Sequence, residues 1–255
     1  MPNLLTYTNI CVILTKQPKE GCENMSINIQ GYIKLSLLDF PGTVSCTVFT
    51  GGCNLRCPFC HNAGLVKTPG AEQNAEGEVL DYLKKRQGVL DGVCVTGGEP
   101  LLQPHLSDFL REVKKMNYLI KLDTNGSLPE ALKNILSENL ADYVAMDIKS
   151  SPDGYHKASG SELPFEIFAE SMRVIRESNK PYEFRTTAVK GIHEKEDFLK
   201  IASLLLPDEK YFIQSFTDSG NILGGGCSPF TNAEMHAILD EVKKILPRAA
   251  LRGQD

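Results

Sequence analysis

Beyond residue 43, short apolar runs alternate with longer stretches in which apolar residues recur every three or four positions. Short runs of this kind are typical of buried β-strands, and the longer stretches are typical of amphipathic helices. The sequence predicts strands at 44–50, 89–96, 118–124, 142–149, 182–189 and 211–216. It predicts helices at about 74–87, 105–116, 129–138, 164–178, 194–205 and 231–246.

Six strand–helix units follow one another with no hairpin signal between them. This order favours a parallel sheet with right-handed crossovers. Six units are too few to close a barrel of eight. The predicted fold class is therefore α/β, with an open, partial (β/α)6 TIM-like barrel.

Polar side chains alternate with apolar ones along three of these strands. Successive side chains point to opposite faces of a sheet, so the polar positions of each strand share one face. In barrels the functional site lies at the C-terminal ends of the strands, and this polar face is expected to meet a charged ligand there. The polar positions are Lys121, Asp123, Asp147, Lys149, Glu183, Arg185 and Thr187.

Three cysteines fall in one short segment, residues 51–62, which we call the cysteine loop. Cys53, Cys57 and Cys60 follow one another at spacings of four and three residues. Soft thiolate ligands suit iron–sulfur and zinc sites. The cysteine loop has no fourth cysteine, so one iron of a four-iron cluster would keep an open position at which a small molecule can react.

Three other readings of the cysteine loop compete with an iron–sulfur cluster. Cys57, Cys60 and His61 fit the haem attachment pattern, but no export signal is visible and Cys53 would have no role. A structural zinc site more usually has two paired knuckles, and no second pair is present in the sequence. A disulfide framework is disfavoured in a large chain with scattered cysteines.

Composition narrows the class of protein further. The chain has 255 residues, 42% apolar and 23% charged, which is ordinary for a globular protein with an adequate core. Its formal charge of −5 provides no general attraction for nucleic acid, and no apolar run approaches the length of a membrane span. Five of the eight cysteines are scattered, which predicts reduced thiols, a cytoplasmic location and no second cluster.

With Phe59 at its aromatic position, the Cys53-x-x-x-Cys57-x-x-Cys60 motif resembles the signature of radical S-adenosylmethionine (SAM) enzymes. His61-Asn62 narrows the resemblance to the activating enzymes of glycyl radical enzymes. The wider run over residues 31–62 is similar to the anaerobic ribonucleoside-triphosphate reductase activating proteins, and later motifs extend the similarity to about residue 217. The resemblance implies a [4Fe–4S] cluster on the three cysteines, with SAM on the fourth iron.

The same resemblance implies contacts to SAM. Gly97-Gly98-Glu99-Pro100 resembles the motif that binds the amino end of SAM, and Asp123 is implied near the SAM carboxylate, with a monovalent cation as one route of contact. Asp147-Ile148-Lys149 resembles the D-x-K motif of these activating enzymes, and this motif and the fifth predicted strand carry further contacts. The implied cofactor-binding residues are Phe59, His61, Asn62, Gly97, Gly98, Glu99, Asp123, Asp147, Lys149, Arg185 and Thr187.

Each of these motifs also has a purely structural reading. Pro100 suits the first position of a helix, and Asn125-Gly126 is a strong turn signal. Asp147 and Lys149 could form a strand-end salt bridge, and a polar strand end would account for the fifth strand.

The later part of the chain departs from one branch of the family. Pyruvate formate-lyase activases carry a cofactor-contacting histidine on the sixth strand, where this chain has Gln214, a weak candidate for that contact. The departure favours the ribonucleotide-reductase branch. We interpret the Gly-rich segment 223–227 as a mobile connector that could touch a partner. The isolated histidines His105, His156, His193 and His236 are interpreted as surface or helix-end residues.

The sequence divides into an extension and one domain. Residues 1–30 are expected to be a disordered N-terminal extension, with Met25 as the natural start, and a short docking strand is the alternative. Residues 31–255 are predicted to form the radical SAM domain.

The implied function is radical generation. The family reductively cleaves SAM to methionine and a 5′-deoxyadenosyl radical, and installs a glycyl radical on a partner enzyme. The resemblance implies an anaerobic ribonucleotide reductase as partner and flavodoxin or ferredoxin as electron donor. Two alternatives stay open: another radical SAM reaction on a small molecule or peptide, and a non-catalytic iron–sulfur electron carrier. A carrier would not account for the Gly97–Pro100 and D-x-K motifs, and its cluster is usually fully ligated.

Overall fold

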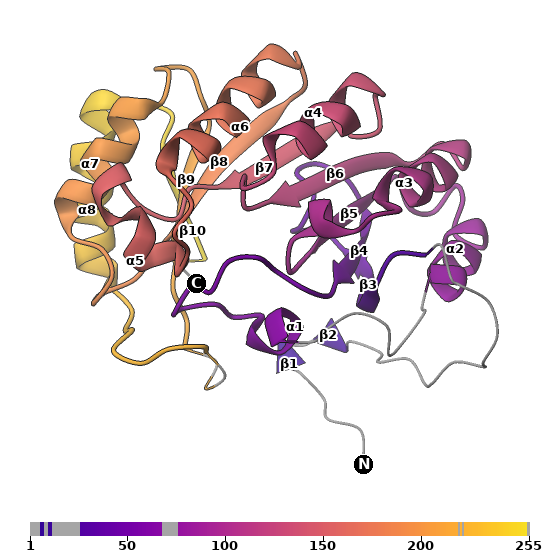
Figure 1. The fold of residues 1–255 in the computed structure, drawn as a ribbon, viewed down its shortest axis with the longest axis horizontal. Coiled ribbons are helices and arrows are strands. Elements are labelled where there is room, and N and C mark those ends of the chain that lie inside the picture. The colour runs from indigo at the N-terminus through magenta and orange to yellow at the C-terminus, as the bar shows by residue number, and fades with distance from the viewer. Residues whose placement is uncertain are drawn as a thin grey trace. The chain divides into compact units, whose positions relative to one another are not determined.

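The computed structural model describes residues 26–67, 76–218, 220 and 222–253, together with residues 6–7 and 10–11. Strands and helices alternate in the predicted order, with ends shifted by a few residues (Figure 1). The strands are β1 (Thr6–Tyr7), β2 (Ile10–Cys11), β3 (Ile29–Ser36), β4 (Ser45–Thr50), β5 (Gly92–Gly97), β6 (Leu119–Thr124), β7 (Tyr143–Asp147), β8 (Tyr182–Ala188), β9 (Tyr211–Ser215) and β10 (Ala250–Arg252). The helices are α1 (Ala63–Lys67), α2 (Glu76–Lys84), α3 (Leu106–Lys115), α4 (Pro129–Ser137), α5 (Tyr155–Ser159), α6 (Phe165–Glu177), α7 (Lys195–Leu204) and α8 (Asn232–Ile245), with 3₁₀ helices η1 (Pro100–Leu102) and η2 (Pro152–Gly154).

The strands β3 to β10 form one sheet in the order β10-β9-β8-β7-β6-β5-β4-β3. Parallel pairing joins β4 to β5, β5 to β6, and β8 to β9, as the strand–helix alternation predicts. Thr50 pairs with Gly97, so the carboxyl ends of β4 and β5 lie level. The segments that follow these two strands therefore begin side by side.

The sequence did not predict β3, which makes the sheet mixed rather than parallel at one edge. β3 pairs antiparallel with β4, and the chain returns between them through residues 37–44. A connection of this length lacks the two-residue glycine turn that marks a hairpin in a sequence. A further strand, β10, adds in parallel to β9 at the other edge.

The predicted N-terminal extension lies for the most part outside the described residues. Within it, β1 and β2 form a short antiparallel pair. Ile27 and Ile29 are buried, because their apolar side chains join the core at the start of β3. The strand β3 therefore begins one residue before the predicted boundary at residue 30.

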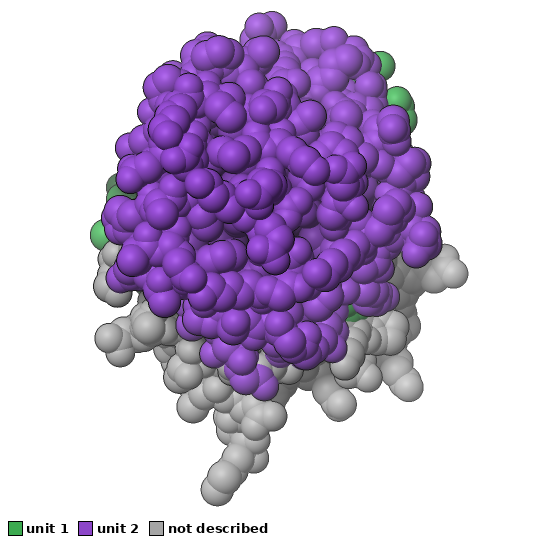
Figure 2. Space-filling model, turned by 90° about the vertical axis from the view of Figure 1, so that its left-hand side faces the viewer, with its two compact units in different colours: residues 1–53, 65–124, 130–144 green, residues 54–64, 125–129, 145–255 purple. Residues whose placement is uncertain are grey.

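The chain divides into two compact units. The first unit is residues 1–53, 65–124 and 130–144, and the second is residues 54–64, 125–129 and 145–255 (Figure 2). Each has its own apolar core: Val48, Val95 and Phe109 are fully buried in the first, and Phe168 and Phe184 in the second. In the second unit, α7 and α8 pack against each other (Figure 1). The cysteine loop passes from one unit to the other directly after Cys53.

A membrane span is not found in the described part of the chain, where every helix is too short or too polar to cross a bilayer.

Candidate active site

In the first unit, the residues that lead into Cys53 lie against the end of β5. The N–H of Gly98 donates to the Thr50 carbonyl at 2.8 Å, and the N–H of Glu99 donates to the Gly52 carbonyl at 2.8 Å. A Cβ on Gly98 would lie 2.0 Å from that Gly52 oxygen, and Gly97 has a φ of +118°. Only glycine permits this approach of two backbones. Gly97 and Gly98 therefore hold in place the chain that enters the cysteine loop.

Glu99 is a fully buried carboxylate at the same place. Its Oε1 accepts hydrogen bonds from the Thr124 hydroxyl at 2.9 Å and from the Leu101 N–H at 3.2 Å. The second bond caps η1, in which Pro100 occupies the first position as its turn chemistry predicts. Buried carboxylates are stable only with such donors. The turn reading of this motif is thus confirmed, and the SAM contact of Glu99 stays a prediction.

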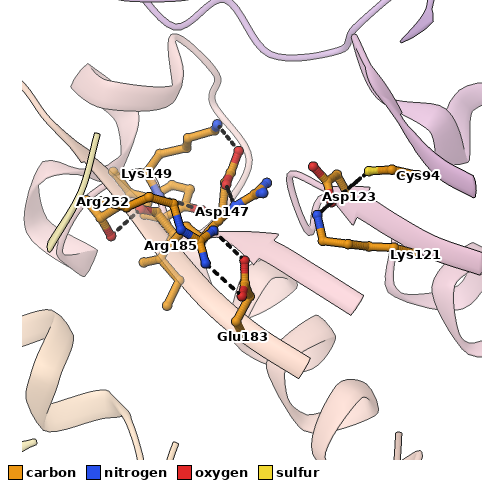
Figure 3. A network of polar contacts seen from close by, with 11 residues as sticks. Cys94, Lys121, Asp123, Asp147, Lys149, Glu183, Arg185 and Arg252 are labelled. Carbon is orange, nitrogen blue, oxygen red and sulfur yellow. Dashed lines mark hydrogen bonds and ion pairs between the residues drawn. The ribbon is translucent and has the colours of Figure 1, made fainter. Parts of the chain in front are cut away.

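Asp123 lies near the carboxyl end of β6 and forms an ion pair with Lys121 (Figure 3). Both side chains come from the polar face that the alternation of the strand predicts. The pair is enclosed, since the Lys121 side chain is 2% exposed and that of Asp123 is 14% exposed.

In the second unit, the C-terminal end of α5 supports the cysteine loop. The Ser159 carbonyl accepts a hydrogen bond from the Arg56 N–H at 2.8 Å and lies 3.7 Å from the Cys57 thiol sulfur. Gly160 has a φ of +59°, and a Cβ there would lie 2.3 Å from the Arg56 oxygen. α5 was not predicted, because a helix of five residues has too short a pattern to recognise.

A hydrogen-bonded turn joins Cys57 and Cys60 in this unit and brings the two residues close together. The Cys60 N–H donates to the Cys57 carbonyl at 3.1 Å. Cys57 is buried and Cys60 is partly exposed. Burial raises the pKa of the Cys60 thiol, whereas the Lys149 ammonium and the N–H of Asn62 oppose that rise. Because iron binds thiolates, these two groups favour the ligating form.

The Gly-rich segment 223–227 contacts the cysteine loop. The Gly224 N–H donates to the Pro58 carbonyl at 2.8 Å, and a Cβ on Gly224 would lie 2.7 Å from the Pro58 Cβ. The prediction was a connector able to touch a partner. The structure shows a glycine packed on the loop that carries Cys57 and Cys60, and the contact with a partner stays a prediction.

A charged network lies where β7 ends, beside the middle of β8 (Figure 3). Asp147 accepts from the Arg185 Nε at 2.8 Å and pairs with the Lys149 ammonium at 3.0 Å. Burial alone would raise the pKa of Asp147, but the two cations hold it well below its ordinary value. One carboxylate and two cations leave a net charge of +1.

Lys149 connects this network to the cysteines. Burial by itself would lower the pKa of Lys149, but Asp147 first, and then Cys57 and Cys60, hold it above its ordinary value. The excess positive charge of the network therefore acts on the two thiols. β7 ends at Asp147, so Lys149 lies just beyond the strand rather than within it as predicted.

His193 corrects a sequence prediction, because it is buried rather than at the surface. The Val189 N–H donates to its Nδ1 at 3.1 Å, so Nε2 carries the proton and donates to the Lys149 carbonyl at 2.7 Å. Its ring also lies 6.0 Å from the buried ring of Phe59. His193 thus fixes the backbone of Lys149 and packs against the aromatic position of the cysteine loop. Lys149 and Phe59 are distant from His193 in sequence, and a lone histidine gives no signal of such partners.

Replacing His193 with glutamine is expected to reduce the loss of stability at mildly acidic pH. Burial lowers the pKa of His193, so the unfolded chain takes up a proton below about pH 6.5 while the folded chain resists it. Stability therefore falls as pH falls through this range, by at most about 1.4 kcal/mol per pH unit. Glutamine can accept from Val189 and donate to Lys149 without titrating. Denaturant unfolding from pH 7.5 to 5.5 would measure the difference, and equal pH slopes for both proteins would contradict this role.

Two further residues predicted to contact SAM, His61 and Thr187, belong to the second unit. The His61 ring lies 5.2 Å from that of Phe216, and burial, with Lys149, lowers the pKa of His61. Thr187 on β8 pairs in register with Gln214 on β9, and both are partly exposed.

Residues 47–205 match the family model described as the radical SAM superfamily. This segment is more than half of the chain and contains the whole cysteine loop. The chain belongs to the radical SAM superfamily. Enzymes of this superfamily use a [4Fe–4S] cluster and SAM, so the predicted enzyme class and these two cofactors are confirmed.

Three relatives indicate which enzymes of the superfamily this chain is similar to. A protein of Methanocaldococcus jannaschii, named provisionally as a glycyl-radical enzyme activating enzyme, is 31% identical over 201 residues, which are 75% of this chain and 81% of the relative. The pyruvate formate-lyase-activating enzyme of Clostridium pasteurianum is 35% identical over 148 residues, covering 55% and 61%. The 7-carboxy-7-deazaguanine synthase of Methanopyrus kandleri is 28% identical over 182 residues, covering 60% and 70%. The resemblance to activating enzymes is confirmed.

A solved structure supports the fold. Streptococcus suis SuiB bound to S-adenosylmethionine aligns over 79% of this chain with a TM-score of 0.63 and 14% identity. This chain spans about half of SuiB, 48% of its length. At this identity the likeness concerns the fold alone, and it agrees with the predicted partial (β/α)6 TIM-like barrel of the radical SAM type.

The residues of the chain fit a cluster of the superfamily type. Cys53, Cys57 and Cys60 are thiols rather than disulfides, and the Lys149 cation acts on two of them. Across the described ranges, no group of three His, Cys, Asp or Glu side chains has the geometry to hold one metal ion. A four-iron cluster differs from a single ion because its cysteines bind separate irons and need not converge on one point.

Proposed function

We propose that this radical SAM enzyme activates a glycyl radical enzyme, and that its partner is an anaerobic ribonucleoside-triphosphate reductase. The observation that carries the kind of partner is the activating-enzyme relative that matches most of the chain and most of its own length. Two features support a ribonucleotide reductase as the partner. Residues 31–62 are similar to the activating proteins of these reductases, and Gln214 stands where pyruvate formate-lyase activases have a histidine.

In this proposal Cys53, Cys57 and Cys60 hold the [4Fe–4S] cluster. When bound, the cluster and SAM together supply reductive cleavage to methionine and the 5′-deoxyadenosyl radical. Gly97, Gly98 and Glu99 contact the amino end of SAM. The other cofactor contacts are Phe59, His61, Asn62, Asp123, Asp147, Lys149, Arg185 and Thr187.

The charged network gives these contacts a physical basis. The net charge of +1 on Asp147, Lys149 and Arg185 attracts thiolates and a carboxylate, and its ion pairs fix the side chains before a ligand arrives. Phe59 of the cysteine loop and the ring of His193 that contacts it are both buried, and they keep water from this side of the loop. Exclusion of water strengthens the electrostatic interactions of the network.

The remaining assignments belong to the same proposal. A flavodoxin or ferredoxin supplies the electron, and the thiols of the chain suit a cytoplasmic location. Residues 31–255 form the catalytic domain, and an N-terminal extension precedes it.

Two alternatives to a ribonucleotide reductase as partner are each supported by one relative. The Clostridium pasteurianum match favours a pyruvate formate-lyase type of partner. The Methanopyrus kandleri match favours a small-molecule reaction. Membership of an enzyme superfamily removes the support for an electron carrier.

Incubating the reconstituted protein anaerobically with SAM, reductant and a candidate partner is expected to produce a glycyl radical. The 5′-deoxyadenosyl radical takes a hydrogen atom from the glycine Cα, which leaves 5′-deoxyadenosine and an unpaired electron on the partner. Electron paramagnetic resonance would detect that electron. A ribonucleotide reductase and a pyruvate formate-lyase from the same genome are tested in parallel, each with a glycine-to-alanine control. SAM cleavage without a signal on either would contradict the proposed kind of partner.

A further inference from the structure

Lys121 is a buried cation outside the predicted set of SAM contacts. Its side chain is 2% exposed, although lysine is almost never fully buried unless it is paired. Its ammonium forms an ion pair with Asp123 Oδ1 and lies 3.8 Å from the Cys94 sulfur (Figure 3). Cys94 in turn lies 3.9 Å from the same Asp123 oxygen. The three groups therefore form one enclosed cluster within the first unit, which we call the Lys121 cluster.

The sheet fixes this cluster. Lys121 and Asp123 are two residues apart on β6, so their side chains leave the same face of the strand. Cys94 pairs with Lys121 across the β5–β6 ladder. The ammonium is thus held by two regular strands rather than by a flexible loop.

The Lys121 cluster does not fit the monovalent cation that the resemblance implies. A bound Na⁺ or K⁺ would neutralise the Asp123 carboxylate and offer a positive charge to an anionic ligand. The Lys121 ammonium already occupies the position beside that carboxylate, as its ion pair with Asp123 shows. An added cation at Asp123 would have to sit beside a buried ammonium, and two like charges in a site of low polarity repel strongly.

We propose that Lys121 is the built-in monovalent cation of this enzyme. Its ammonium neutralises Asp123 and provides the positive charge for the carboxylate of SAM, so the protein needs neither Na⁺ nor K⁺. Lys121 is then the residue that makes the enzyme independent of added Na⁺ and K⁺. The part of this inference that concerns SAM rests on the proposed function, whereas the part that concerns cations can be tested without SAM.

The first test measures the melting temperature of the full chain without SAM. Sodium, potassium and tetramethylammonium chlorides are compared at equal ionic strength. The wild-type protein is expected to melt at the same temperature in all three salts. Lys121→Met is expected to melt roughly 10 °C lower in tetramethylammonium, because a buried carboxylate has lost its partner. Na⁺ or K⁺ should recover part of that loss in a saturable manner.

Three further variants separate charge from packing. Lys121→Arg keeps the charge and should stay independent of the salt. Lys121→Met with Asp123→Asn removes both charges and should lose the preference for small cations. Lys115→Met removes a lysine that is 70% exposed in the same unit and should show no cation effect.

The second test measures SAM affinity of the reconstituted enzyme by equilibrium dialysis. Lys121→Met is expected to bind at least ~10-fold more weakly in tetramethylammonium and to recover in K⁺. Saturable stabilisation of the wild type by Na⁺ or K⁺ over tetramethylammonium would overturn the proposal, even if Lys121→Met did not fold. Wild-type SAM affinity in Lys121→Met without small cations would also overturn it. A wild type that binds but does not cleave SAM would count against the proposed function and leave the cation result standing.

Discussion

Replacing Cys57 with alanine is expected to abolish the cluster and the SAM cleavage that depends on it. Two thiols remain in the cysteine loop, and alanine offers no ligand in place of the third. Loss of a group that merely supports a metal ligand typically costs ~10–100-fold in affinity or activity, so loss of the ligand itself should exceed ~100-fold. Iron content after anaerobic reconstitution should fall well below the ~4 per chain of an intact cluster, with loss of its visible absorption.

The matched control is Cys227→Ser, at a partly exposed cysteine of the Gly-rich segment. This variant should keep its iron, its absorption and its SAM cleavage within about twofold of the wild type, because surface substitutions change little. A Cys57→Ala protein that retained full iron and cleavage would show that Cys57 is not a ligand. Parallel loss in Cys227→Ser would show that the cysteine loop is not the only source of ligands.

Replacing Gly98 with alanine is expected to have the second-largest effect. The added Cβ would lie 2.0 Å from the Gly52 oxygen, so the two backbones must separate. Separation also removes the Glu99 N–H to Gly52 hydrogen bond of 2.8 Å. Overpacking costs ~1–3 kcal/mol and a lost buried hydrogen bond ~1–3 kcal/mol, so the free energy of unfolding should fall by about 3 kcal/mol. Urea denaturation with circular dichroism would measure this fall.

Gly77→Ala provides the comparison. Gly77 lies in α2, and a Cβ there would meet no atom within 4 Å. Alanine should therefore raise the free energy of unfolding by about 0.5–1 kcal/mol, through its better helix propensity. A free energy of unfolding for Gly98→Ala within ~0.5 kcal/mol of the wild-type value would contradict this account. It would show that the backbone contact at Gly52 does not support the start of the cysteine loop.

The regular elements were predictable because their signals are local. The alternation of strands and helices, and the polar face shared by Lys121 and Asp123, follow from periodicity over fewer than twenty residues. Asp147 and Lys149 pair as their spacing indicates. The glycines at 97 and 98 were also predictable as positions of close approach, although the approach that the structure shows is made by the chain at Gly52 rather than by a ligand.

Features that depend on distant contacts were not predictable. His193 is buried because its two ring nitrogens bond the backbones of Val189 and Lys149, and the second lies 44 positions away. The support of Cys57 by Ser159 joins residues 102 positions apart. β10 has only three residues, too few for a periodic pattern. Local patterns in the sequence cannot indicate such contacts, because only the complete fold brings these distant residues together.

The measurement that tests the central claim most directly is SAM cleavage by the full chain under anaerobic conditions. The protein is reconstituted with iron and sulfide, reduced and given SAM, and methionine and 5′-deoxyadenosine are quantified by chromatography. Equal amounts of the two products, formed only with reductant, would agree with a radical SAM enzyme. A fully loaded, reducible protein that left SAM intact, both alone and with either partner, would contradict that account.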